Sequence, residues 1–269
     1  MSRVQLSFIV SLIAGLSTML GLFSSFFKKM SKDKIIIISL AFSSGVMVYI
    51  SFFDLFLSSI NLLNNYYSLL FSILLGIIFA FFGFMLIGIF SSRFDDNLYS
   101  TGLLSFIAMV LHNIPEGIIT FLLMTKDLKI GIPMVISITL HNIPEGISIF
   151  TPLYYSGKKK MAFFYTFIAG FSEVVGSILA YLFLYRFNTI SFFSFLYAFT
   201  SGIMIYVSFN SLMPESLRYK RKSLSYLFFT FGLLFIFVIS KTRWNYSSCL
   251  STIFTVLFSV FTYVSYLIV

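Results

Sequence analysis

Two identical stretches of seven residues hold both histidines of the chain and two of its nine acidic residues. Each reads His-Asn-Ile-Pro-Glu-Gly-Ile, first at residues 112–118 and again at 141–147. A helix places residues four apart on one face, so each histidine lies near the glutamate of its own copy. If the two helices pack face to face, imidazoles, carboxamides and carboxylates converge, a set that suits zinc and iron, and with further oxygens manganese. The candidate metal ligands are His112, Asn113, Glu116, His141, Asn142 and Glu145.

Three carboxylates, those of Glu116, Glu145 and Glu173, fall near the middle of apolar runs long enough to cross a membrane. A charge at the bilayer centre costs about 2.5–3.5 kcal/mol even on the lenient insertion scale. No lysine or arginine is available at that depth to pair with them. A bound divalent cation would compensate their charge, and protonation is the alternative. Glu173 would either complete the metal site or, when protonated, hydrogen-bond across helices.

Three other residues are weaker candidates. Asp54 lies near the outer end of its apolar run and would suit a cation entrance, and Glu215 lies near an inner end and would suit an exit. Both are equally compatible with ordinary acids of the membrane interface. Met47 offers a soft thioether ligand, although a methionine in so apolar a chain more often serves packing.

The elements that carry these residues are apolar to a degree that soluble domains do not reach. The chain has 269 residues, of which 59% are hydrophobic and 10% charged, against about half and a quarter in soluble domains. Because a spanning helix needs about 20 apolar residues, we predict an all-α polytopic membrane protein and exclude a soluble enzyme. The expected spans are 4–27, 35–57, 68–90, 101–124, 131–154, 161–185, 191–213 and 224–240, followed by a ninth apolar run at 248–269.

The distribution of basic residues predicts the orientation. The loops after the first, third, fifth and seventh spans hold 12 Lys and Arg, and the opposite side holds 6. The positive-inside rule therefore puts the N-terminus outside. The net charge of +9 sits in short clusters between apolar runs, which indicates membrane topology and not nucleic-acid binding. We expect a multi-pass protein of the plasma (inner) membrane, with the lipid bilayer and divalent metal ions as its partners.

A second, weaker repeat accompanies the first. Residues 44–52, Ser-Gly-Val-Met-Val-Tyr-Ile-Ser-Phe, resemble residues 201–209, Ser-Gly-Ile-Met-Ile-Tyr-Val-Ser-Phe. The spans that carry each pair of copies cross the membrane in opposite directions. Repeats of opposite direction are typical of inverted-topology transporters, in which the substrate site lies near the midplane of the bilayer.

The doubled His-Asn-x-Pro-Glu-Gly motif resembles that of the ZIP family of divalent metal transporters, in its short bacterial-type branch of ZupT and GufA character. The repeated Ser-Gly-x-Met segments and Glu173 support this resemblance, which covers roughly residues 1–240. It implies an eight-helix bundle with both termini outside and inverted three-helix repeats around helices 4 and 5. It also implies import of zinc and related metals into the cytoplasm, often by a dimer.

The resemblance further implies a binuclear metal centre. By motif position, one site would use both histidines and both motif glutamates, with Met47 as an accessory ligand. The second would use both asparagines, the same two glutamates and Glu173. Glu116 and Glu145 would bridge the two ions.

The chain also departs from the family pattern. Val174 follows Glu173 where the family usually has proline, and Asn210 stands near the position of a late acidic residue. The apolar segment within residues 241–269 is additional to the transport domain at 1–240. If it spans the membrane, the C-terminus lies inside.

The residues are thus interpreted as a transporter that moves zinc, or iron, manganese, cobalt or cadmium, by alternating access. Two alternatives belong to other classes. An intramembrane metalloenzyme could hold a catalytic metal in the same ligands, but the chain has no His-Glu-x-x-His motif and no evident nucleophile. A proton-coupled carrier of an organic substrate could instead protonate Glu116 and Glu145 in turn.

Overall fold

The computed structural model describes residues 2–26, 29–62, 97–184 and 190–242, with four isolated positions between residues 70 and 78. Within these residues all regular secondary structure is helical, which confirms the predicted all-α class. Six of the described helices are long and apolar enough to cross a membrane. α6, at 28 residues, has the length of a spanning helix as well.

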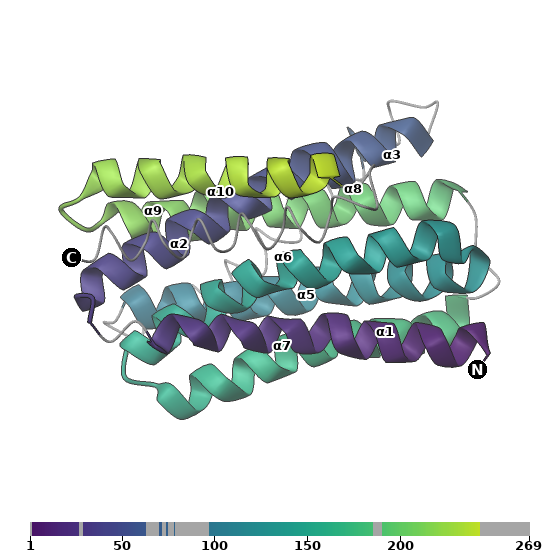
Figure 1. Ribbon diagram of the computed structural model, residues 1–269, viewed down its shortest axis with the longest axis horizontal. Helices are drawn as coiled ribbons and strands as arrows, with labels where there is room; N and C mark the ends of the chain where they lie inside the picture. Colours follow the sequence, from purple (N-terminus) through teal and green to yellow (C-terminus); the bar gives the residue numbers. More distant parts are fainter. Residues whose placement is uncertain are drawn as a thin grey trace.

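The helices alternate in direction along the molecule (Figure 1). Four of them continue into a tighter or wider helical segment labelled η. Of these segments, η1 is a 3-10 helix, and η2, η3 and η5 are π-helices. The elements are α1 (Arg3–Ser17), η1 (Thr18–Phe26), α2 (Lys32–Tyr49), η2 (Ile50–Phe56), α3 (Leu57–Leu62), α5 (Asn97–Lys126), α6 (Leu128–Tyr155), α7 (Lys159–Leu179), η3 (Ala180–Leu184), α8 (Ile190–Val207), η5 (Ser208–Leu212), α9 (Met213–Leu217) and α10 (Lys222–Thr242).

Most of the expected spans coincide with described helices. The first, second and fourth to eighth spans fall on α1–η1, α2–η2, α5, α6, α7–η3, α8–α9 and α10. The third expected span, 68–90, and the ninth apolar run, 248–269, lie outside the described residues. The division of the chain into 1–240 and 241–269 therefore stays a prediction.

Local signals explain where the helices begin. Ser2 and Gln5 form a capping box at α1: the Ser2 hydroxyl accepts from the Gln5 backbone N–H at 3.2 Å, and the Gln5 side chain accepts from the Ser2 N–H at 2.9 Å. Asp127 caps α6, accepting from the Lys129 N–H at 2.9 Å. Because this one residue separates α5 from α6, the two helices are antiparallel neighbours.

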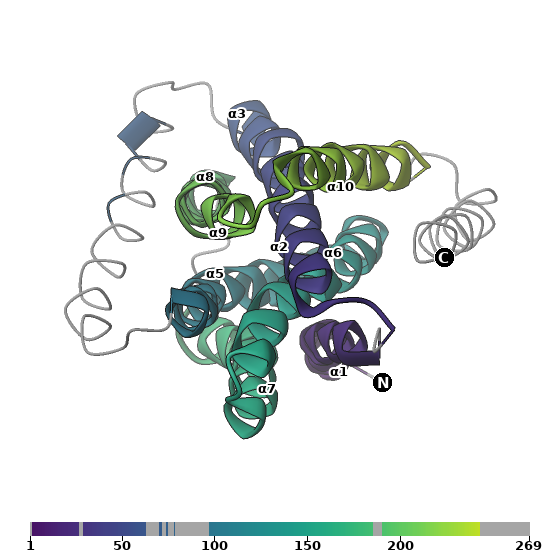
Figure 2. The same cartoon turned by 90° about the vertical axis from the view of Figure 1, so that its left-hand side faces the viewer.

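Two groups of helices pack against each other. α1, α5, α6 and α7 form one group, and α2, α3, α8, α9 and α10 form the other (Figures 1 and 2). The groups meet where α2 packs on α6 and α5 packs on α8. Across this seam the Ser43 hydroxyl donates to the carbonyl of Pro144 at 2.6 Å.

The weaker sequence repeat folds into two matching helices. α2 gives way to a π-helix at Ile50, and α8 does so at the corresponding stretch, at Ser208. The contacts between the two helices are reciprocal: the Ser44 hydroxyl donates to the carbonyl of Ser208 at 3.1 Å, and that of Ser201 donates to the carbonyl of Ser51 at 2.9 Å. Reciprocal contacts of equivalent residues indicate an internal two-fold relation.

α1 and α7 obey the same relation. Their backbones touch at Gly15 and Gly170, because a Cβ on either glycine would collide with the carbonyl oxygen of the other. Both glycines lie in the sequence Ile-Ala-Gly-x-Ser, at 13–17 and 168–172, a repeat that the sequence analysis missed. An internal two-fold thus relates α1 and α2 to α7 and α8, and α5 to α6, in keeping with the expected inverted repeats.

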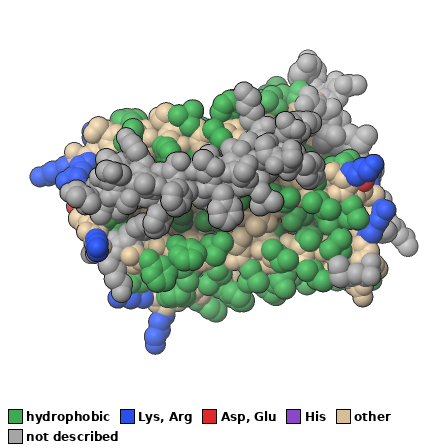
Figure 3. All heavy atoms as spheres, in the orientation of Figure 1, with side chains coloured by type: hydrophobic (Ala, Val, Ile, Leu, Met, Phe, Trp, Pro, Cys, Tyr) green, Lys and Arg blue, Asp and Glu red, His purple; other side chains and the backbone are tan. Residues whose placement is uncertain are grey.

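The outer surface matches a membrane environment. Figure 3 shows a broad apolar face, with lysine and arginine side chains at the two ends of the bundle. The turns after η1, between α6 and α7, and between α9 and α10 lie at one end (Figure 1). These are three of the four loops that the charge count assigns to the cytoplasm, and they do lie together. The loop after the third expected span falls largely outside the described residues, and the side that this end faces stays a prediction.

Candidate metal site

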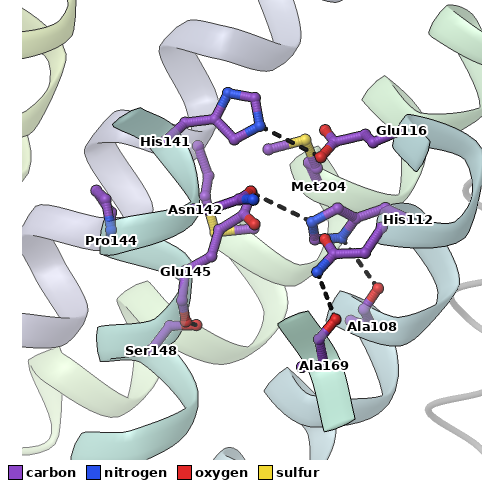
Figure 4. A network of polar contacts seen from close by, with 12 residues as sticks. Ala108, His112, Glu116, His141, Asn142, Pro144, Glu145, Ser148, Ala169 and Met204 are labelled. Carbon is purple, nitrogen blue, oxygen red and sulfur yellow. Dashed lines mark hydrogen bonds and ion pairs between the residues drawn. The ribbon is translucent and has the colours of Figure 1, made fainter. Parts of the chain in front are cut away.

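The two copies of the motif meet face to face in the middle of α5 and α6 (Figure 4). Nε2 of His112 lies 3.2 Å from Oε1 of Glu145, and Nε2 of His141 lies 3.3 Å from Oε2 of Glu116. Each histidine therefore pairs with the glutamate of the other copy. The predicted convergence of the motifs is confirmed, and the role of these residues as ligands stays a prediction.

All four side chains are removed from solvent, with at most 2% of any residue exposed. Single ligand atoms from His112, Glu116 and Glu145 lie within 4.8 Å of one another. Imidazole nitrogens and carboxylate oxygens at this spacing match the donors that divalent transition metals take. Nδ1 of His112 lies 3.0 Å from the carbonyl of Ala108, which orients the ring so that Nε2 faces the carboxylates.

The asparagines are held by their amide nitrogens. Nδ2 of Asn113 donates to the carbonyl of Ala169 at 2.8 Å, and Nδ2 of Asn142 donates to the carbonyl of Ala14 at 2.8 Å. Nδ2 of Asn142 also donates to Oε2 of Glu173 at 2.9 Å, which brings the third carboxylate to the site. With the nitrogens so engaged, the amide oxygens are left for another partner.

Several buried oxygens of the site have no hydrogen-bond donor among the described residues. A buried acceptor without a partner costs about 1–3 kcal/mol, and a charged one more. A divalent cation would satisfy several such oxygens together, so the donor set fits a metal ion. These atoms are Oδ1 of Asn113 and Asn142, Oε1 of Glu116, Oε2 of Glu145 and Oε1 of Glu173.

The motif glycines let α7 and η1 approach this site. A Cβ on Gly117 would collide with the carbonyl oxygen of Glu173, and one on Gly146 with the carbonyl oxygen of Thr18. α7 thus lies against α5 at the level of the ligands. This contact explains how Glu173 reaches a site built on two other helices.

The three accessory candidates lie in different surroundings. Met47 is fully buried on α2. Glu215 lies in α9, where Oε2 is 3.2 Å from Nε of Arg218, and Asp54 lies half-buried in the π-helix η2. The entrance and exit roles of the two acids therefore stay predictions.

Met204 is a residue that the sequence analysis did not propose. It is fully buried on α8, and Figure 4 shows its sulfur beside the pair formed by His141 and Glu116. It occupies the position in the Ser-Gly-Ile-Met repeat that Met47 occupies in the other copy. The repeat could have identified Met204, because a role proposed for Met47 applies equally to the equivalent methionine of the other copy.

A multi-pass helical bundle with buried histidine and carboxylate donors midway along its central helices defines an intramembrane metal-site protein of the transporter class. Residues 96–240 match the model of the ZIP zinc transporter family. The chain is similar to the zinc transporter ZupT of Oceanobacillus iheyensis, with 35% identity over 84% of this chain and 93% of the relative.

Two further relatives carry the same name. The zinc transporter ZupT of Clostridium perfringens is 32% identical over 81% of this chain and 89% of its own length. That of Streptococcus mutans is 33% identical over 86% of this chain and 95% of its own length. The chain belongs to the ZIP zinc transporter family, whose members are transporters and not enzymes.

Proposed function

We propose that this protein transports divalent metal ions, zinc first among them, through the site between α5 and α6. The observation that carries the proposal is the crossed pairing of two buried histidines with two buried glutamates, whose carboxylates retain oxygens that accept from no donor among the described residues. A lysine or arginine side chain would neutralise these carboxylates permanently. A mobile cation would neutralise them as well and could then leave the site.

The site has enough donor atoms, of two kinds, to bind two ions. The histidines and glutamates favour one zinc position with nitrogen and oxygen donors, and the asparagines with Glu173 favour a second with oxygen donors alone. Glu116 and Glu145 would bridge them. Iron, manganese, cobalt and cadmium are further candidate substrates, since all accept these donors.

Alternating access would use the two groups of helices. All the central donors lie on α5, α6 and α7, within one group, whereas α2 and α8 of the other group carry the two methionines. Sliding of one group along the other would open the ions first to one side and then to the other. The charge count supports import into the cytoplasm across the plasma membrane, and the family resemblance supports a homodimer.

Zinc-65 uptake into proteoliposomes tests the proposal. Wild type is compared with His141→Ala and Glu145→Gln. Thr230→Ala is the control, because Thr230 is exposed on α10 and its hydroxyl donates to the carbonyl of Tyr226 in the same helix. We expect the two site variants to lose at least about tenfold in uptake and the control to match wild type.

Folding of every variant is checked by size-exclusion chromatography and thermal unfolding. Wild type that takes up no zinc, iron, manganese or cobalt would contradict metal transport. Flux of an organic solute that is insensitive to chelators would favour the proton-coupled carrier instead.

A further inference from the structure

The internal two-fold relation is broken at one position of the site. α1–η1 and α7 share the sequence Ile-Ala-Gly-x-Ser, and the next residue is Thr18 in the first copy and Glu173 in the second. Their surroundings are equivalent. A Cβ on Gly170 would lie 3.3 Å from Cβ of Thr18, and one on Gly15 would lie 3.5 Å from Cβ of Glu173.

The hydrogen bonds around the two positions are equivalent as well. The carbonyl of Ala14 accepts from Ser17 at 2.6 Å and from Nδ2 of Asn142 at 2.8 Å. The carbonyl of Ala169 accepts from Ser172 at 2.6 Å and from Nδ2 of Asn113 at 2.8 Å. Each asparagine thus donates to a carbonyl that lies one helical turn before the varied residue: Ala14 before Thr18, and Ala169 before Glu173.

This anchoring leaves the hydroxyl of Thr18 without its usual partner. Threonines in helices commonly donate to the carbonyl four residues earlier, as Thr125, Thr139 and Thr166 do here. For Thr18 that carbonyl is Ala14, which already accepts two side-chain donors. Oγ1 of Thr18 is fully buried and has no hydrogen-bond partner among the described residues.

Four buried oxygens, one from each of four elements, therefore have no hydrogen-bond partner in the part of the chain that the structure describes, and the two-fold relates their residues in pairs. Two are amide oxygens on α5 and α6, one is a carboxylate oxygen on α7, and one is the hydroxyl oxygen on η1. They belong to Asn113, Asn142, Glu173 and Thr18. The two-fold exchanges the two asparagines, and it likewise exchanges the positions of Thr18 and Glu173. Thr18 and Glu173 therefore lie on opposite sides of the position between the two asparagines.

We propose that the Thr18 hydroxyl is a further oxygen ligand of the divalent cation held by the asparagines and Glu173, on the side opposite to Glu173. The inference rests on the proposed transport function and adds a ligand to its oxygen-only position. A neutral hydroxyl completes the coordination without adding a negative charge. A carboxylate at the same position would hold the ion more tightly. The hydroxyl also favours manganese, which prefers oxygen donors, more than zinc, which binds the histidines.

Equilibrium dialysis of purified protein against Mn²⁺ or Zn²⁺ tests this ligand. Thr18→Val removes the hydroxyl and keeps the shape of the side chain. We expect it to weaken Mn²⁺ binding about fivefold, the equivalent of one lost polar interaction, and Zn²⁺ binding less than about twofold. Thr18→Ser should retain the wild-type ratio of the two affinities.

Thr200→Val is the matched control, because the Thr200 hydroxyl is also fully buried and has no partner within the described part of the chain, but lies on α8, outside the four elements. It should leave both affinities unchanged. If folded Thr18→Val binds Mn²⁺ as tightly as wild type, the inference is wrong while the proposed function stands. The same holds if Thr18→Val and Thr18→Ser both lose affinity for Mn²⁺ and Zn²⁺ to an equal extent. Wild type that binds neither metal would overturn the proposed function and the inference with it.

Discussion

At the scale of single residues, the decisive contact is between the two motif copies and not within either one. Spacing predicts that His112 and Glu116 share a helix face, which is correct, but the carboxylate that His112 meets belongs to Glu145. The equivalent pair joins His141 to Glu116. A helix face can be read from spacing, whereas the partner across the interface depends on how two helices are registered against each other.

Met204 provides a prediction at this scale. Its thioether lies beside the His141–Glu116 pair (Figure 4), and soft sulfur donors favour cadmium more than manganese. Met204→Leu keeps the volume of the side chain and removes the sulfur. We expect Cd²⁺ binding to weaken about threefold, a loss in the range of sulfur contacts, and Mn²⁺ binding to remain unchanged in competition dialysis.

The matched control for this experiment is Met124→Leu. Met124 is fully buried in α5, three turns from His112, and packs against the start of α6 at Gly131. If both methionine variants lower Cd²⁺ binding equally, Met204 acts through packing and not as a donor.

At the scale of elements, two wide helical turns occupy matching positions, where α2 continues into η2 and α8 into η5. Each begins within the Ser-Gly-x-Met repeat, and Ser51 and Ser208 bond back to the carbonyls of Met47 and Met204, at 2.6 and 2.8 Å. Single π-helical turns within α-helices are frequently found at functional sites. Here they hold the methionines of both repeats in equivalent settings on the seam between the two groups of helices.

The reciprocal serine bonds between α2 and α8 should stabilise the second group of helices to a similar extent. Ser44→Ala and Ser201→Ala each remove one interhelical hydrogen bond, and each is expected to lower the free energy of unfolding by about 0.6 kcal/mol. Denaturant titration in detergent micelles measures the change. Thr230→Ala, on the exposed face of α10, should leave the stability unaltered; a large inequality between the two serine variants would argue against their equivalence.

At the scale of the whole molecule, the basic turns after η1, between α6 and α7 and between α9 and α10 lie at one end of the bundle (Figure 1). We expect this end to face the cytoplasm. Lys160→Cys at that end and Lys129→Cys at the other, each exposed and each with Cys249→Ser, form a matched pair. An impermeant thiol reagent should label Lys129→Cys in intact cells and Lys160→Cys only after permeabilisation. The reverse pattern would invert the orientation and the direction of transport.

Much of this architecture could be predicted from the sequence, because apolar length defines membrane spans and the motif copies are identical. Seven expected spans coincide with helices among the described residues. The motif histidines and glutamates pair across the two helices, and Asn142 joins Glu173 to them, whereas their role as metal ligands stays a prediction. The proposed role of Thr18 could not be predicted, because it is an ordinary residue type in an apolar run and only packing against Gly146 brings it to the site. Met204 could be found only through its equivalence to Met47 in the repeat.

The turn between α5 and α6 is one residue, Asp127, and it separates the members of both crossed pairs. The stretch before it supplies one imidazole and one carboxylate, and the stretch after it supplies their counterparts. A chain cut at this turn would yield two fragments that each hold half of every pair, so neither would recognise the ion before finding the other. A substitution at any one of these four residues therefore alters a pair that the other copy of the motif completes.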